Sequence, residues 1–183
     1  MRFIVKTCPQ RSGYIPYLKE RIPNLEVVVD PGGGVMDCFQ ESLRVAGEDA
    51  VVHLEDDIVL TENFCEKALA VIADFPYVLI QFFSMRKKDL EIGSRWEPGR
   101  TFLMNQCVYY PEGMSRDLLE YSEDWFEAGN GKIATDDLVA LFLRGRGMDY
   151  YLHVPSLVDH RVGRSVSNPK RSSKRQSLTF QSK

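Results

Sequence analysis

Short apolar runs of strand character alternate with helix-like stretches along the first third of the chain. The apolar runs fall at residues 3–7, 25–30 and 50–54, and amphipathic stretches separate them at residues 14–22 and 35–47. This strand, helix, strand, helix, strand order is typical of a parallel sheet with helices packed on it. The sequence therefore predicts an α/β fold with a mostly parallel sheet flanked by helices.

The rest of the chain continues the alternation with one interruption. Residues 77–83 form a continuous apolar run, as expected for a strand that is buried on both faces. Residues 84–100 are polar and aperiodic, which predicts a long loop, and we interpret it as a lid that faces a substrate. The other predicted elements are a helix at 61–74, a strand at 101–111, a short helix and a connection within 112–129, a helix at 134–147 and a last strand at 148–160, broken at Pro155.

The composition fits one ordinary globular domain, with 183 residues of which 44% are apolar and 27% charged. No apolar stretch is long enough for a signal peptide or a membrane span, which favours a cytoplasmic protein. The four cysteines are widely spaced and form no C-x-x-C pair, so we expect reduced, structural thiols and no zinc site.

The charge is distributed unevenly along the chain. Residues 161–183 hold seven Lys or Arg and no acid, which leaves 16 basic and 26 acidic residues before them. We therefore divide the chain into a main domain, residues 1–169, and a basic C-terminal tail, residues 170–183. Such a tail could meet a diphosphate, a nucleic acid or an anionic membrane surface, or it could be solvated and serve solubility alone.

Three consecutive carboxylates, Glu55, Asp56 and Asp57, follow the apolar run at residues 50–54. Neighbouring carboxylates repel one another and raise each other's pKa unless solvent or a cation offsets their charge. The carboxyl end of a strand is also where open α/β sheets bind ligands. The triplet is thus the first candidate for a functional site, with an exposed acidic turn as the alternative.

The ordered set of elements and motifs resembles the GT-A glycosyltransferases over most of residues 2–165. The stretch "ESLRVAGEDAVVHLEDDIVLTENFCEKAL" is similar to the part of that family from the helix before its D-x-D motif to the helix after it. "TDDLVALFLRGRG" and the late His160 resemble later family features, and "PSLVDHRVGRSVSNP" is similar to the ends of small bacterial and phage-encoded glycosyltransferase-like proteins. The resemblance implies a single-domain GT-A-like (Rossmann-like) fold.

The same resemblance implies a metal-dependent transfer of a sugar from a nucleotide-diphosphate sugar, with a UDP-sugar expected, to a hydroxyl acceptor with inversion. Asp57 and His160 would be the ligands of Mn²⁺ or Mg²⁺, since oxygen ligands suit both ions and imidazole suits Mn²⁺. Asp137 would be the catalytic base that takes the acceptor's proton, with Asp136 in support. Two acids in the first turn of a helix are equally well explained by the helix dipole.

Donor-binding residues follow from the same comparison. Glu55 would face the ribose or a coordinated water, although Glu in place of the family's first Asp lengthens the reach, and Asp56 would support the turn. Thr7 and Arg11 come at and after the end of the first strand, where the fold binds the nucleotide base, and Asp30 ends the second strand, in position for the base or ribose. Arg161, Arg164 and Ser165 would hold the diphosphate, because guanidinium groups bind phosphate through two parallel hydrogen bonds.

Two other classes of function stay open at this point. A nucleotidyltransferase shares an α/β sheet and an acidic metal site, but it usually carries a Gly-rich basic signature after the first strand, which "KTCPQRSG" resembles only faintly. A nucleic-acid-binding protein would use the basic tail. Nucleic-acid binding and sugar transfer would combine in a glycosyltransferase that acts on modified DNA bases, which would need both an acidic metal site and a basic surface. The acceptor is therefore left open between a polysaccharide and modified DNA.

Overall fold

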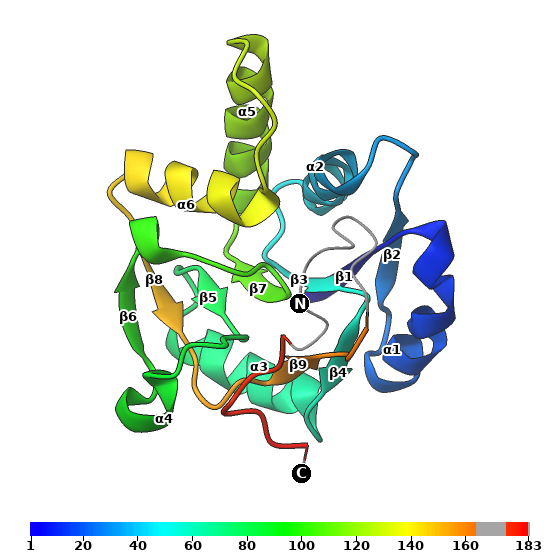
Figure 1. Cartoon of the computed structure of the whole chain (residues 1–183), viewed down its shortest axis with the longest axis vertical. Coiled ribbons are helices and arrows are strands. Elements are labelled where there is room, and N and C mark those ends of the chain that lie inside the picture. The colour runs from blue at the N-terminus through cyan, green and yellow to red at the C-terminus, as the bar shows by residue number, and fades with distance from the viewer. Residues whose placement is uncertain (164–174, 183) are drawn as a thin grey trace.

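The computed structural model describes residues 1–163 and 175–182, and a seven-stranded sheet forms its centre (Figure 1). The strands lie in the order β2-β1-β3-β7-β5-β8-β6. Their bounds are β1 Arg2–Thr7, β2 Glu26–Val29, β3 Val51–Glu55, β5 Ile80–Gln81, β6 Arg95–Pro98, β7 Cys107–Tyr110 and β8 Asp149–Leu152. Strand β1 pairs in parallel with β2 and β3, and β5 with β8, whereas β7 and β6 run antiparallel to their neighbours. Five of the seven strands therefore point the same way, which confirms the predicted α/β fold with a mostly parallel sheet.

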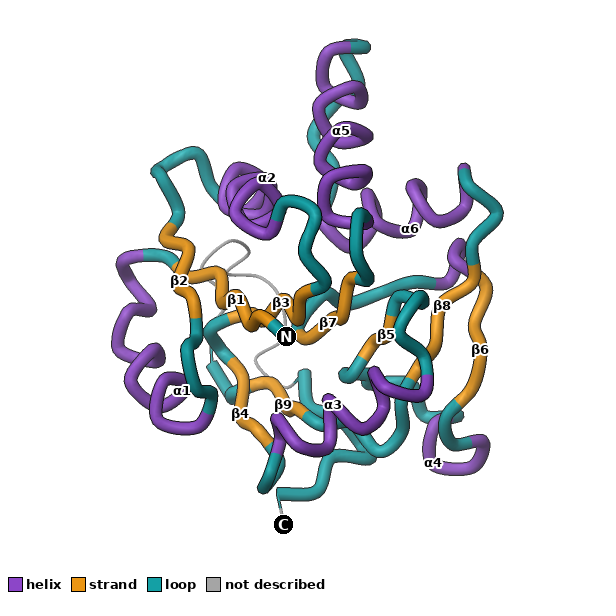
Figure 2. Tube along the Cα trace, turned by 180° about the vertical axis from the view of Figure 1, so that it is seen from behind, coloured by secondary structure: helices purple, strands orange, loops and turns teal. Residues whose placement is uncertain are grey.

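Helices cover both faces of this sheet (Figures 1 and 2). One face carries α1 (Ile15–Arg21), which follows the short 3-10 helix η1 (Pro9–Tyr14), and α3 (Phe64–Asp74). The other face carries α2 (Val35–Ala46), α5 (Met114–Glu127) and α6 (Thr135–Gly145). Among the described residues, none of the helices is both long and apolar enough to cross a membrane.

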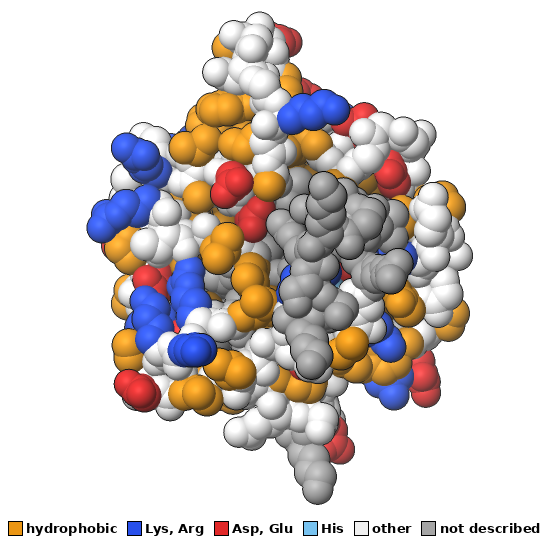
Figure 3. Space-filling model, in the orientation of Figure 1, with side chains coloured by type: hydrophobic (Ala, Val, Ile, Leu, Met, Phe, Trp, Pro, Cys, Tyr) orange, Lys and Arg blue, Asp and Glu red, His pale blue; other side chains and the backbone are white. Residues whose placement is uncertain are grey.

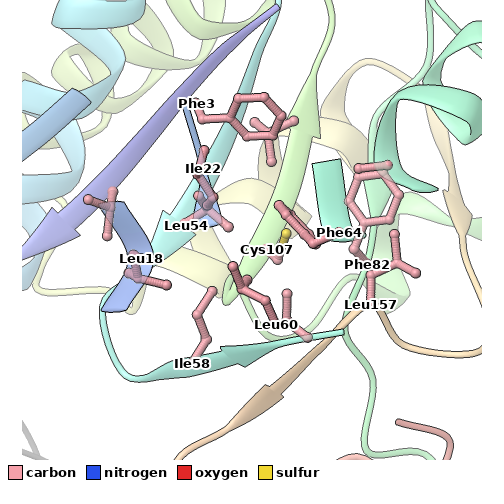
Figure 4. Close-up of a cluster of buried hydrophobic side chains, with 14 of the residues drawn as sticks. Phe3, Leu18, Ile22, Leu54, Ile58, Leu60, Phe64, Phe82, Cys107 and Leu157 are labelled. Atoms are coloured by element: carbon pink, nitrogen blue, oxygen red, sulfur yellow. The ribbon is translucent and has the colours of Figure 1, made fainter. Parts of the chain in front are cut away.

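Side chains of β1 alternate between the two layers, as the pleat of a strand requires. Phe3 and Val5 pack with α1 and α3 in the core drawn in Figure 4, whereas Ile4 packs with α2 on the other face. Leu54 and Val51 of β3 are divided between the two cores in the same way. Because both faces of these strands are apolar, the polar side chains that could form a site gather where the strands end.

A second, two-stranded sheet joins the segment after the acid triplet to the end of the main domain. Strand β4 (Ile58–Leu60) pairs antiparallel with β9 (Val158–His160), so that Ile58 lies opposite His160. The described part of the tail packs beside this sheet. Asp159 Oδ1 accepts a hydrogen bond of 2.7 Å from the Ser177 amide, and Thr61 Oγ1 donates one of 2.8 Å to the Gln181 carbonyl. Ser177 and Gln181 thus attach this part of the tail to the domain, and the expected boundary between residues 169 and 170 lies outside the described residues.

The predicted loop and lid at residues 84–100 are wrong. This segment contains α4 (Asp89–Ile92), β6 and the 3-10 helix η2 (Gly99–Thr101), and β6 forms the edge of the sheet beside β8. Buried Glu97 lies 2.7 Å from Lys88 Nζ, 2.6 Å from Arg95 Nε and 3.6 Å from Arg86 Nη1. The irregular charges are therefore an ion network that fixes an edge strand, and the Lys and Arg side chains of this side of the molecule are seen together in Figure 3. Charged side chains also protect such an edge against pairing with other chains.

Four other predicted elements have different bounds. Helix α3 begins at Phe64 rather than near residue 61, and β5 and β7 cover only part of the apolar runs at 77–83 and 101–111. Helix α5 is continuous over 14 residues instead of short. Its acidic residues lie on the solvent side, as Glu123 does, while Leu118 and Ser122 are buried against the domain. The acidic sequence is thus one face of an amphipathic helix.

Glu97→Gln is expected to lower the free energy of unfolding at neutral pH by about 1–3 kcal/mol, because it removes the charge that three basic side chains share. Burial raises the pKa of Glu97, but hydrogen bonds from Lys88 and Arg95 outweigh this effect and hold that pKa below its ordinary value. The extra stability that the Glu97 charge gives the wild type is therefore complete above the ordinary pKa of glutamate. It is lost as the pH falls through the lowered pKa of Glu97 in the folded protein. Urea unfolding across this pH range measures the difference. The exposed Glu91→Gln on α4 is the control, and a difference that does not shrink in acid would contradict the prediction.

Candidate functional site

A cavity of about 610 Å³ opens at the carboxyl ends of β1, β2 and β3. Helix α1 leaves β1 over one face of the sheet and α2 leaves β2 over the other, so the cavity lies at the switch point where such folds bind ligands. The amino ends of α2 and α6 complete the wall. Eight of the residues that the sequence singled out lie in it: Thr7, Arg11, Asp30, Glu55, Asp56, Asp57, Asp136 and His160.

Each carboxylate of the triplet lies beside a basic side chain. Lys6 Nζ is 3.3 Å from Glu55 Oε1, because Lys6 and Glu55 are register partners on β1 and β3. Arg11 Nη1 donates to both of the other acids, at 3.0 Å to Asp56 Oδ1 and 2.5 Å to Asp57 Oδ2. The triplet is thus neutralised by cations of the chain itself and is not an exposed acidic turn.

Two further contacts come from neighbouring elements. The Thr7 hydroxyl donates a hydrogen bond of 2.7 Å to Asp56 Oδ2. His160 Nε2 lies 3.1 Å from Asp57 Oδ2, because the pairing of β4 with β9 brings the end of the domain next to the triplet. Asp57 is therefore the carboxylate on which basic groups from both ends of the domain converge.

The three acids do not have equivalent environments. Burial raises the pKa of Glu55 despite the nearby Lys6 charge, and it raises the pKa of Asp56 despite hydrogen bonds from Thr7 and Arg11. Burial acts on Asp57 too, but the hydrogen bond and charge of His160, together with Arg11, hold the pKa of Asp57 below its ordinary value. Asp57 is consequently the member of the triplet whose negative charge is most firmly established.

The two acids in the first turn of α6 point in different directions. Asp136 lies in the cavity wall and its Oδ2 accepts a hydrogen bond of 3.2 Å from the Met104 amide. Asp137 is exposed and is not among the lining residues, because successive residues of a helix point about 100° apart. The geometry therefore favours Asp136 as the acid that meets a ligand, which reverses the order that the resemblance implied.

Of the remaining residues expected to bind the donor, Asp30 lies in the cavity wall and Arg161 does not. Asp30 Oδ1 accepts hydrogen bonds from the Gly32 and Gly34 amides at 2.9 and 3.0 Å, which shapes the turn into α2 at the cavity wall. Arg161 is not among the lining residues; its guanidinium stacks 5.0 and 4.5 Å from the ring centroids of Tyr14 and Tyr17. Arg164 and Ser165 lie outside the described residues.

No protein-family model matches the sequence, and no curated protein matches it either. Among solved structures, A197 from STIV superposes with a TM-score of 0.54 at 18% identity, over 99% of this chain and 95% of that one. The glycosyltransferase TarS of S. aureus, residues 1–349 in complex with UDP-GlcNAc, superposes with a TM-score of 0.53 at 11% identity, over 86% of this chain and 57% of that one. The chain has a glycosyltransferase-like fold. At these identities the likeness concerns the fold alone.

The next question is whether the described residues of the cavity could hold the expected divalent ion. The described residues contain no group of three or more His, Cys, Asp or Glu that could hold a metal ion. Asp57 and His160 do form a pair of possible ligands. His160 Nδ1 lies 2.6 Å from the Arg161 carbonyl, which only accepts, so Nδ1 carries a proton, as in many metal-binding histidines. The pair therefore fits an ion whose other ligands are phosphate oxygens and water, although such an ion would compete with Arg11 for Asp57 Oδ2.

Four of the lining residues that were not identified from the sequence as individual contacts contribute charge or hydrogen-bonding groups that matter here. Lys6 is a lysine within an otherwise apolar strand, which is a signal that could have been noticed. Asn105 and Gln106 precede β7 and looked like an ordinary polar start of a strand. Arg175 belongs to the basic tail, lines the cavity and helps to lower the pKa of Asp57. Part of the tail's positive charge thus reaches the site.

Arg11→Met is expected to destabilise the fold at neutral pH by about 1–3 kcal/mol, because Asp56 and Asp57 then repel each other without their shared guanidinium. The loss should shrink as the pH falls below the ordinary carboxylate range, where both acids are protonated in folded and unfolded protein. Chemical unfolding at neutral and acid pH measures it. Arg44→Met removes surface ion pairs only and should stay within about 0.5 kcal/mol of wild type. Equal losses for the two variants would contradict the central role of Arg11.

Proposed function

We propose that the chain is a glycosyltransferase that takes a nucleotide-diphosphate sugar, with a UDP-sugar as first candidate, and transfers the sugar to a hydroxyl group. The observation that carries this proposal is the acid triplet with its basic partners, placed in a cavity at the switch point of a glycosyltransferase-like fold. UDP-GlcNAc is the ligand in the TarS complex. The acceptor stays open between a polysaccharide and modified DNA.

The charges of the cavity suit a diphosphate leaving group. Arg11 and Arg175 line the cavity beside Asp57, and a guanidinium can bind the oxygens of a phosphate through two hydrogen bonds. A divalent ion held by Asp57 and His160 would stabilise the negative charge that develops on the departing diphosphate. Thr7 and Asp30, at the ends of β1 and β2, are placed for the nucleotide end of the donor.

Asp136 is the proposed base. Its carboxylate is held by the Met104 amide at the wall of the cavity, and it can accept the proton of the acceptor hydroxyl. The acceptor oxygen then forms a bond to the anomeric carbon while the bond from that carbon to the diphosphate oxygen breaks, and the electron pair leaves with the diphosphate. A single displacement of this kind inverts the anomeric centre.

Specific features of the described residues favour this function over the two alternatives. The segment after β1 forms η1, whose Arg11 binds the acids, and is not an open Gly-rich phosphate loop. Arg175, the one basic residue among the described residues 175–182 of the tail, lines the cavity beside Asp57, where it can serve a donor.

The function is tested by thermal unfolding with UDP-, GDP-, CMP- and TDP-sugars, each with Mn²⁺ and with a chelator. One class of donor should stabilise the wild type by about 2.7 kcal/mol at a hundredfold excess over its dissociation constant, and more strongly with Mn²⁺. Asp57→Asn should abolish the part that depends on Mn²⁺, whereas Asp74→Asn at the exposed end of α3 should leave it intact. If no donor changes the unfolding temperature under either condition and none is hydrolysed, the proposed function is wrong.

The two acids of α6 offer a matched pair of variants for the base. Asp136→Asn should lower the rate of sugar transfer, or of slow donor hydrolysis, by about 10²–10⁴-fold while donor affinity is retained. Asp137→Asn should leave the rate close to wild type, because that side chain lies outside the cavity wall. Steady-state kinetics on both variants measure the contrast. A larger loss for Asp137→Asn would restore the assignment implied by the family resemblance.

A further inference from the structure

Three buried polar atoms in the wall of the cavity make no hydrogen bond among the described residues, although one of them, Lys6 Nζ, forms an ion pair of 3.3 Å with Glu55 Oε1 and keeps further N–H groups to donate. They are Lys6 Nζ, Asn105 Nδ2 and Gln106 Oε1, and the side chains that carry them all line the cavity. Lys6 and Asn105 are each only 5% exposed. Buried polar groups are nearly always hydrogen-bonded, because leaving one unpaired is costly. Three such atoms in one wall therefore indicate a place that a polar ligand completes.

These groups are held in fixed positions by the sheet. Asn105 Oδ1 accepts a hydrogen bond of 2.9 Å from the buried Tyr110 hydroxyl, which leaves the amide nitrogen of Asn105 for another partner. The backbone carbonyl of Gln106 accepts a hydrogen bond of 2.9 Å from the Glu55 backbone amide, which ties the start of β7 to the end of β3. Lys6 Nζ lies beside Glu55 and 5.1 Å from the centroid of the Phe39 ring. Groups held in this way by strands of one sheet, Lys6 on β1 and the two amides at the start of β7, are suited to precise recognition.

The location of these groups separates them from the nucleotide end of the cavity. The strand order β2, β1, β3, β7 puts Asn105 and Gln106 on the far side of the acid triplet from Asp30. Asp136 is bonded to the Met104 amide, next to Asn105 in the chain. Asn105 and Gln106 thus lie beyond the acid triplet and near the proposed base, where the transferred group has to lie, and Lys6 of β1 borders this place beside Glu55.

The mixture of donors and acceptors identifies the chemistry of the ligand. Lys6 and Asn105 offer N–H groups, whereas Gln106 Oε1 needs a donor. An ionised phosphate has no proton to give, but a hydroxyl group both donates and accepts. We infer that Lys6, Asn105 and Gln106 bind the hydroxyl groups of the transferred sugar, which makes them residues that determine sugar affinity. This inference rests on the proposed function.

The test compares how each substitution changes the affinity for a nucleotide-diphosphate sugar and for the matching nucleoside diphosphate. By calorimetric titration, Asn105→Leu should weaken binding of the sugar nucleotide about tenfold and leave the affinity for the nucleoside diphosphate unchanged. Gln106→Leu should show the same selective loss, and it is the second variant if Asn105→Leu does not fold. Asn130→Leu, which lies on the surface after α5, is the control and should change neither affinity.

The outcomes separate this inference from the proposed function. If the two variants lose affinity equally for the sugar nucleotide and the nucleoside diphosphate, or lose none for either, the inference is wrong. The proposed function would still be supported in that case, because the wild type binds the nucleotide. A wild type that binds neither compound, with or without Mn²⁺, would overturn the proposed function and the inference with it. A loss seen only for the acceptor, with donor affinity unchanged, would also overturn the assignment to the transferred sugar.

Discussion

Repulsion between three adjacent carboxylates is the constraint around which the site is arranged. Each acid at the end of β3 is partly or fully buried, so its charge has to be offset by a group that the fold brings to it. Lys6 comes from β1, Arg11 from η1 and His160 from β9, and the first and last of these residues are 154 positions apart in the sequence. The order of the central strands and the pairing of β4 with β9 are therefore conditions for the acids to be buried at all.

This arrangement also explains why the same groups are suited to a diphosphate. The basic side chains already hold negative charge inside the cavity, and a phosphate oxygen presents the same kind of acceptor as a carboxylate. Arg11 is the clearest case, since one nitrogen serves both Asp56 and Asp57 and has further N–H groups to offer. A diphosphate that enters the cavity would share these donors with the acids, and the negative charge that it adds would itself need an offsetting cation.

The sequence predicted what depends on local pattern, and it missed what depends on contacts between distant residues. The alternation of strand and helix and the position of the triplet could be inferred from periodicity and from the ends of strands, whereas the contribution of His160 to the cavity was implied only by the family resemblance. The edge strand at residues 95–98 could not, because Glu97 becomes a structural group only when Arg86 and Lys88 fold back on to it. The choice between Asp136 and Asp137 required the exact first residue of α6, to which sequence patterns are least sensitive.

The short strand β9 connects two features that the sequence treats as separate. Asp159 and His160 are consecutive, so the pleat directs their side chains to opposite faces of the small sheet. Asp159 binds the Ser177 amide of the tail, and His160 meets Asp57 in the cavity. Any displacement of this strand is therefore felt both at the acid triplet and at the docked tail, whose Arg175 contributes positive charge beside Asp57. The tail is for this reason part of the electrostatics of the site, and the balance between acids and cations there depends on a three-residue strand holding its register.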